Sequence, residues 1–186
     1  MWVKICGLTR REDAMTAAAL GADALGFVFT GSPRRVWPEL VSPWVRGLTG
    51  IEKVAVFTTE PVEEIMAVCD GLCIDTIQLH AEPAVDHERL SRRYGIIYAM
   101  GEVRKDRMPD FPCRILVDAS RGKGVPVEWR KRDIPYILAG GLNPGNVREA
   151  VRTARPAGVD VSSGVEAAPG IKDPVKVENF IREARS

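Results

Sequence analysis

Two glycine-rich segments in the C-terminal third of the chain have the residue types that bind a phosphate group through the backbone. Gly158 to Val161 is predicted to be a short buried strand, and Ser162-Ser163-Gly164 follows at a point where a helix can begin. The first N–H groups of a helix are unpaired and lie at its positive end, so they bind anions without a lysine. This turn is therefore a candidate anion site. Taken alone, it is interpreted equally well as an ordinary strand-to-loop turn.

The second segment lies about one strand-helix unit earlier. An apolar strand beginning at Ile134 runs into Gly140-Gly141, and Asn143-Pro144 then supplies a predicted N-cap and first-turn proline. In (β/α)8 barrels a phosphate site commonly lies after strands 7 and 8. The pair of segments therefore predicts a parallel barrel that binds a phosphorylated small molecule at the C-terminal ends of its strands.

Strand-like and helix-like segments alternate along the whole chain, which is typical of a parallel sheet with crossover helices. Strands are expected at residues 2–6, 23–29, 53–57, 76–79, 96–100, 114–117, 134–139 and 158–161. Helices are expected at residues 9–20, 38–48, 61–69, 83–94, 143–154 and 173–184. The fold class is therefore α/β, a (β/α)8 TIM barrel that occupies residues 1–186 as a single domain.

The barrel is expected to be compact, because 186 residues are few for a fold that typically takes about 250. Residues 101–112 and 120–132 contain no good amphipathic helix, so the helices after strands 5 and 6 are predicted to be shortened or missing. Among the other helices, Thr9 with Glu12 suggests a capping box at the start of the first. Pro43 is expected to kink the second or restart it at Ser42.

Composition excludes several classes of function. The net charge of +1 gives no global attraction to nucleic acid or to an anionic membrane. The N-terminal apolar run is too short for a signal peptide, so a cytoplasmic location is expected. Cys69 and Cys73, with His80 and His87 nearby, match no standard zinc spacing. We predict no metal site, and interpret the two cysteines as a buried structural pair.

The C-terminal ends of the strands are where a barrel of this class presents reactive side chains. The residues at these ends are Cys6, Arg35, His80, Asp118, Gly140, Gly141, Asp160, Ser163 and Gly164. They include a candidate base, a candidate acid and an anion site, a combination that folding does not need. Structural roles remain open: a buried thiol for Cys6, a loop cap for Asp118 and an arginine partner for Asp160. A structural role is favoured for Asp160 and His80.

Six motifs, in one order from residue 3 to about residue 180, resemble phosphoribosylanthranilate isomerases. They are Lys4-Ile5-Cys6-Gly7-Leu8-Thr9, Gly26-Phe27-Val28-Phe29 with Ser32-Pro33-Arg34-Arg35, Gln78-Leu79-His80, Leu116-Val117-Asp118, Ala139-Gly140-Gly141-Leu142-Asn143-Pro144, and Asp160-Val161-Ser162-Ser163-Gly164-Val165-Glu166 with Pro169-Gly170. The resemblance implies an Amadori rearrangement of N-(5′-phosphoribosyl)anthranilate in tryptophan biosynthesis. No cofactor is expected, because both proton transfers are internal.

The resemblance also implies residue roles. Cys6 would be the general base, and Asp118 a general acid kept protonated in a closed site. The phosphate would bind near Gly140-Gly141 and Ser163-Gly164, and Arg35 would bind the anthranilate carboxylate through both oxygens. Asp160 would lie near the anthranilate ring or its amine. A nearby cation would lower the pKa of the thiol, but Lys4 is expected to point away from it.

This sequence departs from the family at Ala81, where a glycine is usual, and in a shorter, more cationic loop at 120–129 that we expect to close over the substrate. Two other functions compete with this one. A histidine-pathway-like aminoaldose isomerase is disfavoured by Cys6, because those relatives have an aspartate there. A non-catalytic barrel that senses a sugar phosphate is disfavoured by the retained Cys6 and Asp118. The protein is expected to be a monomer or a homodimer.

Overall fold

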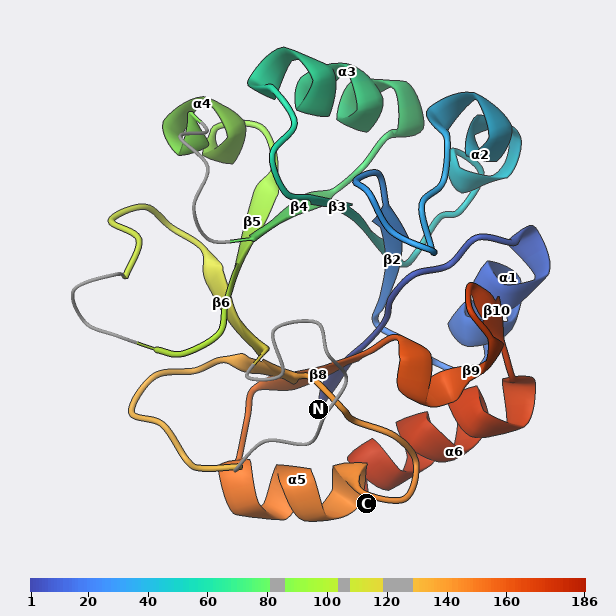
Figure 1. Ribbon diagram of the computed structural model, residues 1–186, viewed down its shortest axis with the longest axis vertical. Coiled ribbons are helices and arrows are strands. Elements are labelled where there is room, and N and C mark those ends of the chain that lie inside the picture. The colour runs from blue at the N-terminus through green and yellow to red at the C-terminus, as the bar shows by residue number, and fades with distance from the viewer. Residues whose placement is uncertain (81–85, 104–107, 119–128) are drawn as a thin grey trace.

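The computed structural model describes residues 1–80, 86–103, 108–118 and 129–186, and its centre is a closed barrel of eight parallel strands (Figure 1). Neighbouring strands pair in chain order, and the last strand pairs with the first, Lys4 opposite Asp160. The strands are β1 (Trp2–Ile5), β2 (Ala24–Val28), β3 (Glu52–Phe57), β4 (Thr76–His80), β5 (Gly95–Met100), β6 (Arg114–Asp118), β7 (Ile137–Ala139) and β8 (Gly158–Val161). The predicted (β/α)8 class is confirmed.

Helices surround the barrel, and Figure 1 shows α1 to α4 outside β2 to β5, and α5 and α6 outside β8. They are α1 (Arg11–Ala19), α2 (Pro38–Val45), α3 (Val62–Leu72), α4 (His87–Ser91), α5 (Val147–Ala154) and α6 (Pro174–Ala184). The described parts of the β5–β6 and β6–β7 connections contain no α-helix. None of the helices in the described ranges is long and apolar enough to cross a membrane.

Side-chain alternation along the strands divides the buried residues into two sets. One face of each strand packs against the helices, with residues such as Phe27 and Leu79 in the main hydrophobic core. The other face points into the barrel, where Val54 and Leu116 belong to a separate small cluster. The barrel interior also holds a charged residue, Lys4, which is fully buried. This interior lysine matters for the site described below.

Two of the predicted helix signals, at Thr9 and at Asn143, are wrong. Thr9 does not cap α1: its hydroxyl donates to the Gly170 carbonyl at 2.6 Å, and the N-cap residue is Arg10. α2 is continuous through Pro43, so it does not restart at Ser42, while the kink expected at Pro43 stays a prediction. α5 begins at Val147, not at Asn143. In the first case a partner about 160 residues away in the chain takes the hydroxyl, which a local sequence pattern does not reveal.

The segment after β8 contains a hairpin that the sequence analysis did not predict. A single 3-10 turn, η2 (Ser163–Val165), leads into β9 (Glu166–Ala168) and β10 (Ile171–Lys172), which pair antiparallel. α6 then begins with Asp173 as its N-cap, whose carboxylate accepts from the N–H groups of Val175 and Lys176. The hairpin places Glu166 and Lys172 beside the C-terminal ends of the strands.

Other sequence predictions have mixed outcomes. Cys69 is buried, but Cys73 is exposed at the end of α3, so the expected buried pair is half right. α4 is shorter than expected, and Asp86 caps it by accepting from the N–H of Arg89 at 2.9 Å. Ala81, Pro83 and the altered loop at 119–128 lie outside the described residues.

Candidate active site

A cavity of about 170 Å³ opens at the C-terminal ends of β6, β7 and β8. It brings together the two glycine-rich turns that the sequence analysis singled out. Its described lining residues are Arg34, Asp118, Ala139, Gly140, Gly141, Leu142, Asp160, Val161, Ser162, Ser163 and Gly164. The lining is predominantly polar and carries charges of both signs, which suits a ligand with an anionic group and hydroxyls.

Gly164 is the point at which the two turns touch. A Cβ atom built on Gly164 would lie 1.9 Å from the carbonyl oxygen of Leu142 and 3.1 Å from the Cα of Asn143. No side chain fits there, so glycine lets the turn after β8 pack directly against the loop after β7. Residues of both turns therefore line one small space.

The glycine pair after β7 adopts a backbone that other residues avoid. Gly140 has φ of 92° and Gly141 has φ of 67°, both in the left-handed region. Asn146 holds this loop, because its Nδ2 donates to the Gly141 carbonyl at 2.9 Å and its Oδ1 accepts from the N–H of Asn143 at 2.8 Å. Asn143 was the predicted cap, but Asn146 is the residue whose side chain shapes the loop.

Cys6 follows β1 and packs with Val28 and Val56 inside the mouth of the barrel. Burial raises the pKa of the Cys6 thiol, and the positive charge of Lys4 opposes that shift. The expectation that Lys4 points away from Cys6 is wrong. Residues two apart on a strand share a face, and the Lys4 ammonium lies inside the barrel, 2.8 Å from the Asp160 carboxylate.

His80, Asp118 and Asp160 converge on the same end of the barrel. His80 ends β4 and Asp118 ends β6, and both border the barrel mouth. Burial lowers the pKa of His80, while the negative charges of Asp118 and Asp160 oppose that shift. The structure therefore brings together four of the predicted side chains: Cys6, His80, Asp118 and Asp160. The predicted partner of Asp160 was an arginine, and the observed partner is Lys4.

Arg35 is not among the described residues that line this cavity. Arg35 is exposed, and its guanidinium carbon lies 4.0 Å from the ring centroid of Trp37. Its neighbour Arg34 lines the cavity instead. Gly7 fixes this arrangement, because a Cβ there would lie 2.4 Å from Cδ of Arg34.

A buried ion-pair network holds Arg34 in place. The Arg34 guanidinium donates to both carboxylate oxygens of Glu166, at 2.7 and 2.8 Å. Lys172, whose side chain is 2% exposed, donates to the same carboxylate at 2.8 Å and to the Ser162 carbonyl at 3.1 Å. Burial opposes ionisation of Glu166, but its hydrogen bonds to Arg34 and Lys172 outweigh that effect and lower its pKa. Glu166 stands in one of the quoted motifs, yet its function as a clamp was not predicted.

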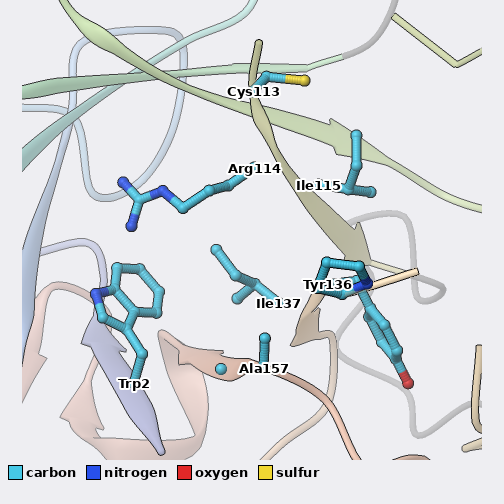
Figure 2. Close-up of a pocket in the computed structure, with 9 residues that line it drawn as sticks. Trp2, Cys113, Arg114, Ile115, Tyr136, Ile137 and Ala157 are labelled. Atoms are coloured by element: carbon cyan, nitrogen blue, oxygen red, sulfur yellow. The ribbon is translucent and has the colours of Figure 1, made fainter.

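A second cavity, of about 260 Å³, lies at the opposite end of the barrel, where the strands begin. Figure 2 shows Arg114 of β6 reaching toward the indole of Trp2, and the guanidinium carbon lies 5.0 Å from that ring's centroid. Arg114 also pairs with Glu52, so its charge is neutralised. The remaining lining is mostly apolar, and this end of a barrel serves stability and not chemistry. The smaller C-terminal cavity is therefore the candidate active site.

Comparison with known proteins finds relatives of this chain along its whole length. The family model of N-(5′-phosphoribosyl)anthranilate isomerase matches residues 3–183. The N-(5′-phosphoribosyl)anthranilate isomerase of Geotalea uraniireducens is 40% identical, with 98% of each chain covered. That of Desulforudis audaxviator is 38% identical and covers 98% of this chain and 97% of its own.

Solved structures resemble this chain along its whole length as well. A phosphoribosyl anthranilate isomerase in complex with reduced 1-(o-carboxyphenylamino)-1-deoxyribulose 5-phosphate is 37% identical, with a TM-score of 0.84 over 100% of this chain and 98% of its own. Monomers generated from the dimeric enzyme of Thermotoga maritima give the same identity and TM-score, over 100% of this chain and 99% of theirs.

Proposed function

Because the chain belongs to the N-(5′-phosphoribosyl)anthranilate isomerase family, we propose that Cys6 and Asp118 are the general base and general acid of its reaction. The enzyme converts N-(5′-phosphoribosyl)anthranilate into 1-(2-carboxyphenylamino)-1-deoxyribulose 5-phosphate in tryptophan biosynthesis. The observation that carries the assignment is the position of a thiol and a carboxyl group at one barrel mouth, beside a cavity bordered by two glycine-rich turns.

The proposed reaction begins with the acid. Asp118, in its protonated form, gives its proton to the ribose ring oxygen as the bond from that oxygen to C1′ breaks, and the substrate nitrogen becomes an iminium. The positive nitrogen acidifies the proton on C2′. Cys6, as the thiolate, removes that proton, and the electron pair of the C–H bond forms the C1′–C2′ double bond of an enolamine. Protonation at C1′ and loss of the C2′ hydroxyl proton then give the ketone.

The substrate phosphate is proposed to bind between the two glycine-rich turns. Gly140, Gly141, Ser163 and Gly164 line one space, because Gly164 allows the turns to touch, and we propose that their N–H groups bind the phosphate. Backbone donors at such turns bind phosphate without a mobile side chain, which fixes the sugar relative to Cys6 and Asp118. Support for this assignment comes from the resemblance of both turns to the family and from their shared cavity.

Arg34 takes the carboxylate-binding role that was first given to Arg35. Its guanidinium lies at the cavity, while two of its N–H donors are engaged by Glu166. Arginine has five donors, so further donors remain for the anthranilate carboxylate. His80 and Asp160 are proposed to contact the anthranilate portion from the opposite side of the mouth.

The proposal also covers the location, domain organisation and oligomeric state of the protein. We place the enzyme in the cytoplasm as one domain of residues 1–186, acting on a phosphorylated small molecule as a monomer or a homodimer. The relative from Thermotoga maritima is described as a dimer from which monomers were generated, so both states fold in that protein. Sedimentation equilibrium on the purified protein distinguishes the two.

The test separates turnover from binding. Cys6→Ala and Asp118→Asn should each reduce kcat by at least about 1,000-fold, as expected when a required proton donor or acceptor is removed. Both variants should still bind reduced 1-(o-carboxyphenylamino)-1-deoxyribulose 5-phosphate within a few-fold of the wild-type Kd. Arg34→Lys should weaken that binding while Arg35→Lys does not. If Cys6→Ala turns over at the wild-type rate, Cys6 is not the general base, and the same result for Asp118→Asn would rule out Asp118 as the general acid.

A further inference from the structure

Lys4 is a charged side chain at a position inside the barrel where an apolar side chain would be enough for folding. It lies on β1 inside the barrel, with a side-chain exposure of 0%. Its ammonium donates to Oε1 of Gln78 and to Oδ1 of Asp160, each at 2.8 Å. Burying an ammonium costs several kcal/mol unless partners compensate, and a buried ion pair often stabilises a protein no better than packed apolar residues. A role other than stability is therefore indicated.

The position of Gly26 shows how close Lys4 comes to the proposed base. A Cβ atom built on Gly26 would lie 2.8 Å from Sγ of Cys6 and 3.0 Å from Cε of Lys4. The two side chains thus converge over the same glycine of β2. Lys4 and Cys6 are two residues apart on one strand, so both point into the barrel. Glycine at position 26 provides the space for this convergence.

We propose that Lys4 is a positioning residue that supplies the positive charge facing the Cys6 sulfur, and that Gln78 and Asp160 hold its ammonium in that position. The proposal rests on Cys6 being the base. A thiol is an effective base only as the thiolate, and a neighbouring cation stabilises that form. Lys4 would therefore set the fraction of enzyme that is ready to remove the C2′ proton.

The charges around Cys6 do not all act in one direction. Burial favours the neutral thiol and is the largest influence on its pKa, which it raises. Lys4 opposes burial most strongly, Lys172 acts in the same direction as Lys4, and the negative charge of Asp160 acts against both. Arg34 also interacts with the sulfur. Without Lys4, only weaker positive charges would counter burial and the negative charge of Asp160. The pKa of the Cys6 thiol should therefore rise.

The charge of Lys4 is itself maintained by its partners. Burial alone lowers the pKa of Lys4, but Asp160 and Cys6 outweigh it and raise the value above that of an ordinary lysine. When His80, at the end of β4, carries a positive charge, that charge repels the charge of Lys4. Because burial also lowers the pKa of His80, it favours the neutral imidazole and so reduces this effect on Lys4.

The experiment measures the thiol directly. Alkylation of Cys6 by iodoacetamide is followed by peptide mass spectrometry from pH 6 to 11, in wild type, Lys4→Met, Lys4→Gln and Lys53→Met. Lys4→Met should raise the midpoint of alkylation by at least about one pH unit, so the rate below the midpoint falls at least tenfold. The acidic limb of kcat/KM should move to higher pH by the same amount. Lys53→Met, which replaces another buried lysine on β3, should change neither.

Lys4→Gln separates a charge effect from a structural one, because glutamine still donates a hydrogen bond to Asp160 but carries no charge. The proposal predicts that it behaves like Lys4→Met, whereas a wild-type alkylation profile in Lys4→Gln would overturn it. If the Lys4 variants do not fold, alkylation of the wild-type protein still tests the proposal. Cys6 should reach its alkylation midpoint within this pH range, whereas Cys69, whose pKa burial and the negative charge of Asp70 raise to about 12, should not. A wild-type Cys6 that reaches no midpoint below pH 11 would also overturn the proposal.

Because alkylation does not require turnover, a failure of Cys6 as the catalytic base remains distinguishable from a failure of Lys4. If Cys6→Ala keeps full activity, the proposed function of Cys6 is wrong whatever the alkylation profile. If Cys6→Ala is inactive and Lys4→Met alkylates like wild type, only the inference about Lys4 is wrong.

Discussion

Replacing Gly164 with alanine should separate the two glycine-rich turns. The new Cβ would lie 1.9 Å from the Leu142 carbonyl oxygen, and reaching ordinary van der Waals contact requires a shift of about 1.5 Å. Both contacts are backbone, so no flexible side chain absorbs the shift. A misplacement of about 1 Å can cost about 100-fold in rate, so kcat/KM should fall by at least that factor, or about 2.7 kcal/mol of transition-state stabilisation.

The assay follows the loss of phosphoribosylanthranilate fluorescence, with the Kd for inorganic phosphate measured in parallel. Gly71→Ala is the matched control, because a Cβ at Gly71 on α3 meets nothing within 4 Å and its backbone is helical. The control should keep wild-type kinetics and gain slightly in stability. If Gly164→Ala keeps kcat/KM within twofold of wild type and binds phosphate equally well, the two turns do not form the phosphate site.

Four further predictions concern the surrounding structure. Glu166→Gln should raise KM about tenfold with a smaller effect on kcat, because a charge-assisted pair that fixes Arg34 is weakened; the exposed Glu63→Gln should change nothing. The pKa of Glu166 is lower in the folded state than its unfolded value of about 4.3, so ionised Glu166 stabilises the fold above that pH. This stability is lost as the pH falls through the folded pKa. The free energy of unfolding of Glu166→Gln, measured in urea, should therefore depend less on pH in that acidic range. Asp173→Ala should cost about 1 kcal/mol of unfolding free energy through loss of the α6 cap, and an unchanged urea midpoint would contradict that role. The NMR titration of His80 should have a midpoint below about 6.5, since burial lowers its pKa, and a midpoint above 7 would show that the neighbouring carboxylates dominate.

The order of the strands was predictable because each carries its own signal. β2 and β3 are apolar on both faces, as strands covered on both sides must be, and each is found within two residues of its predicted bounds. Helix starts were less predictable, since they depend on partners. Thr9 has the sequence of a capping residue but donates to Gly170, on the β9–β10 hairpin that no local pattern indicated.

The candidate site was predictable at its strand ends and not in its supporting contacts. Cys6 and Asp118 were found because a barrel presents such residues at one face. Arg34 and Arg35 are adjacent and chemically identical, so only the packing of the loop against Gly7 and Glu166 separates them. The orientation of Lys4 was predictable from the sequence, because residues two apart on a strand, such as Lys4 and Cys6, point to the same face.

The most direct test of the account is a single-turnover measurement of phosphoribosylanthranilate fluorescence, with hydrogen or deuterium at C2′, in wild type and Cys6→Ala. Single turnover removes product release from the observed rate, so the proton transfer itself is seen. The account predicts that deuterium slows the wild-type decay and that Cys6→Ala shows no decay above the uncatalysed rate. Decay in Cys6→Ala at the wild-type rate would contradict it, because another group would then remove the C2′ proton.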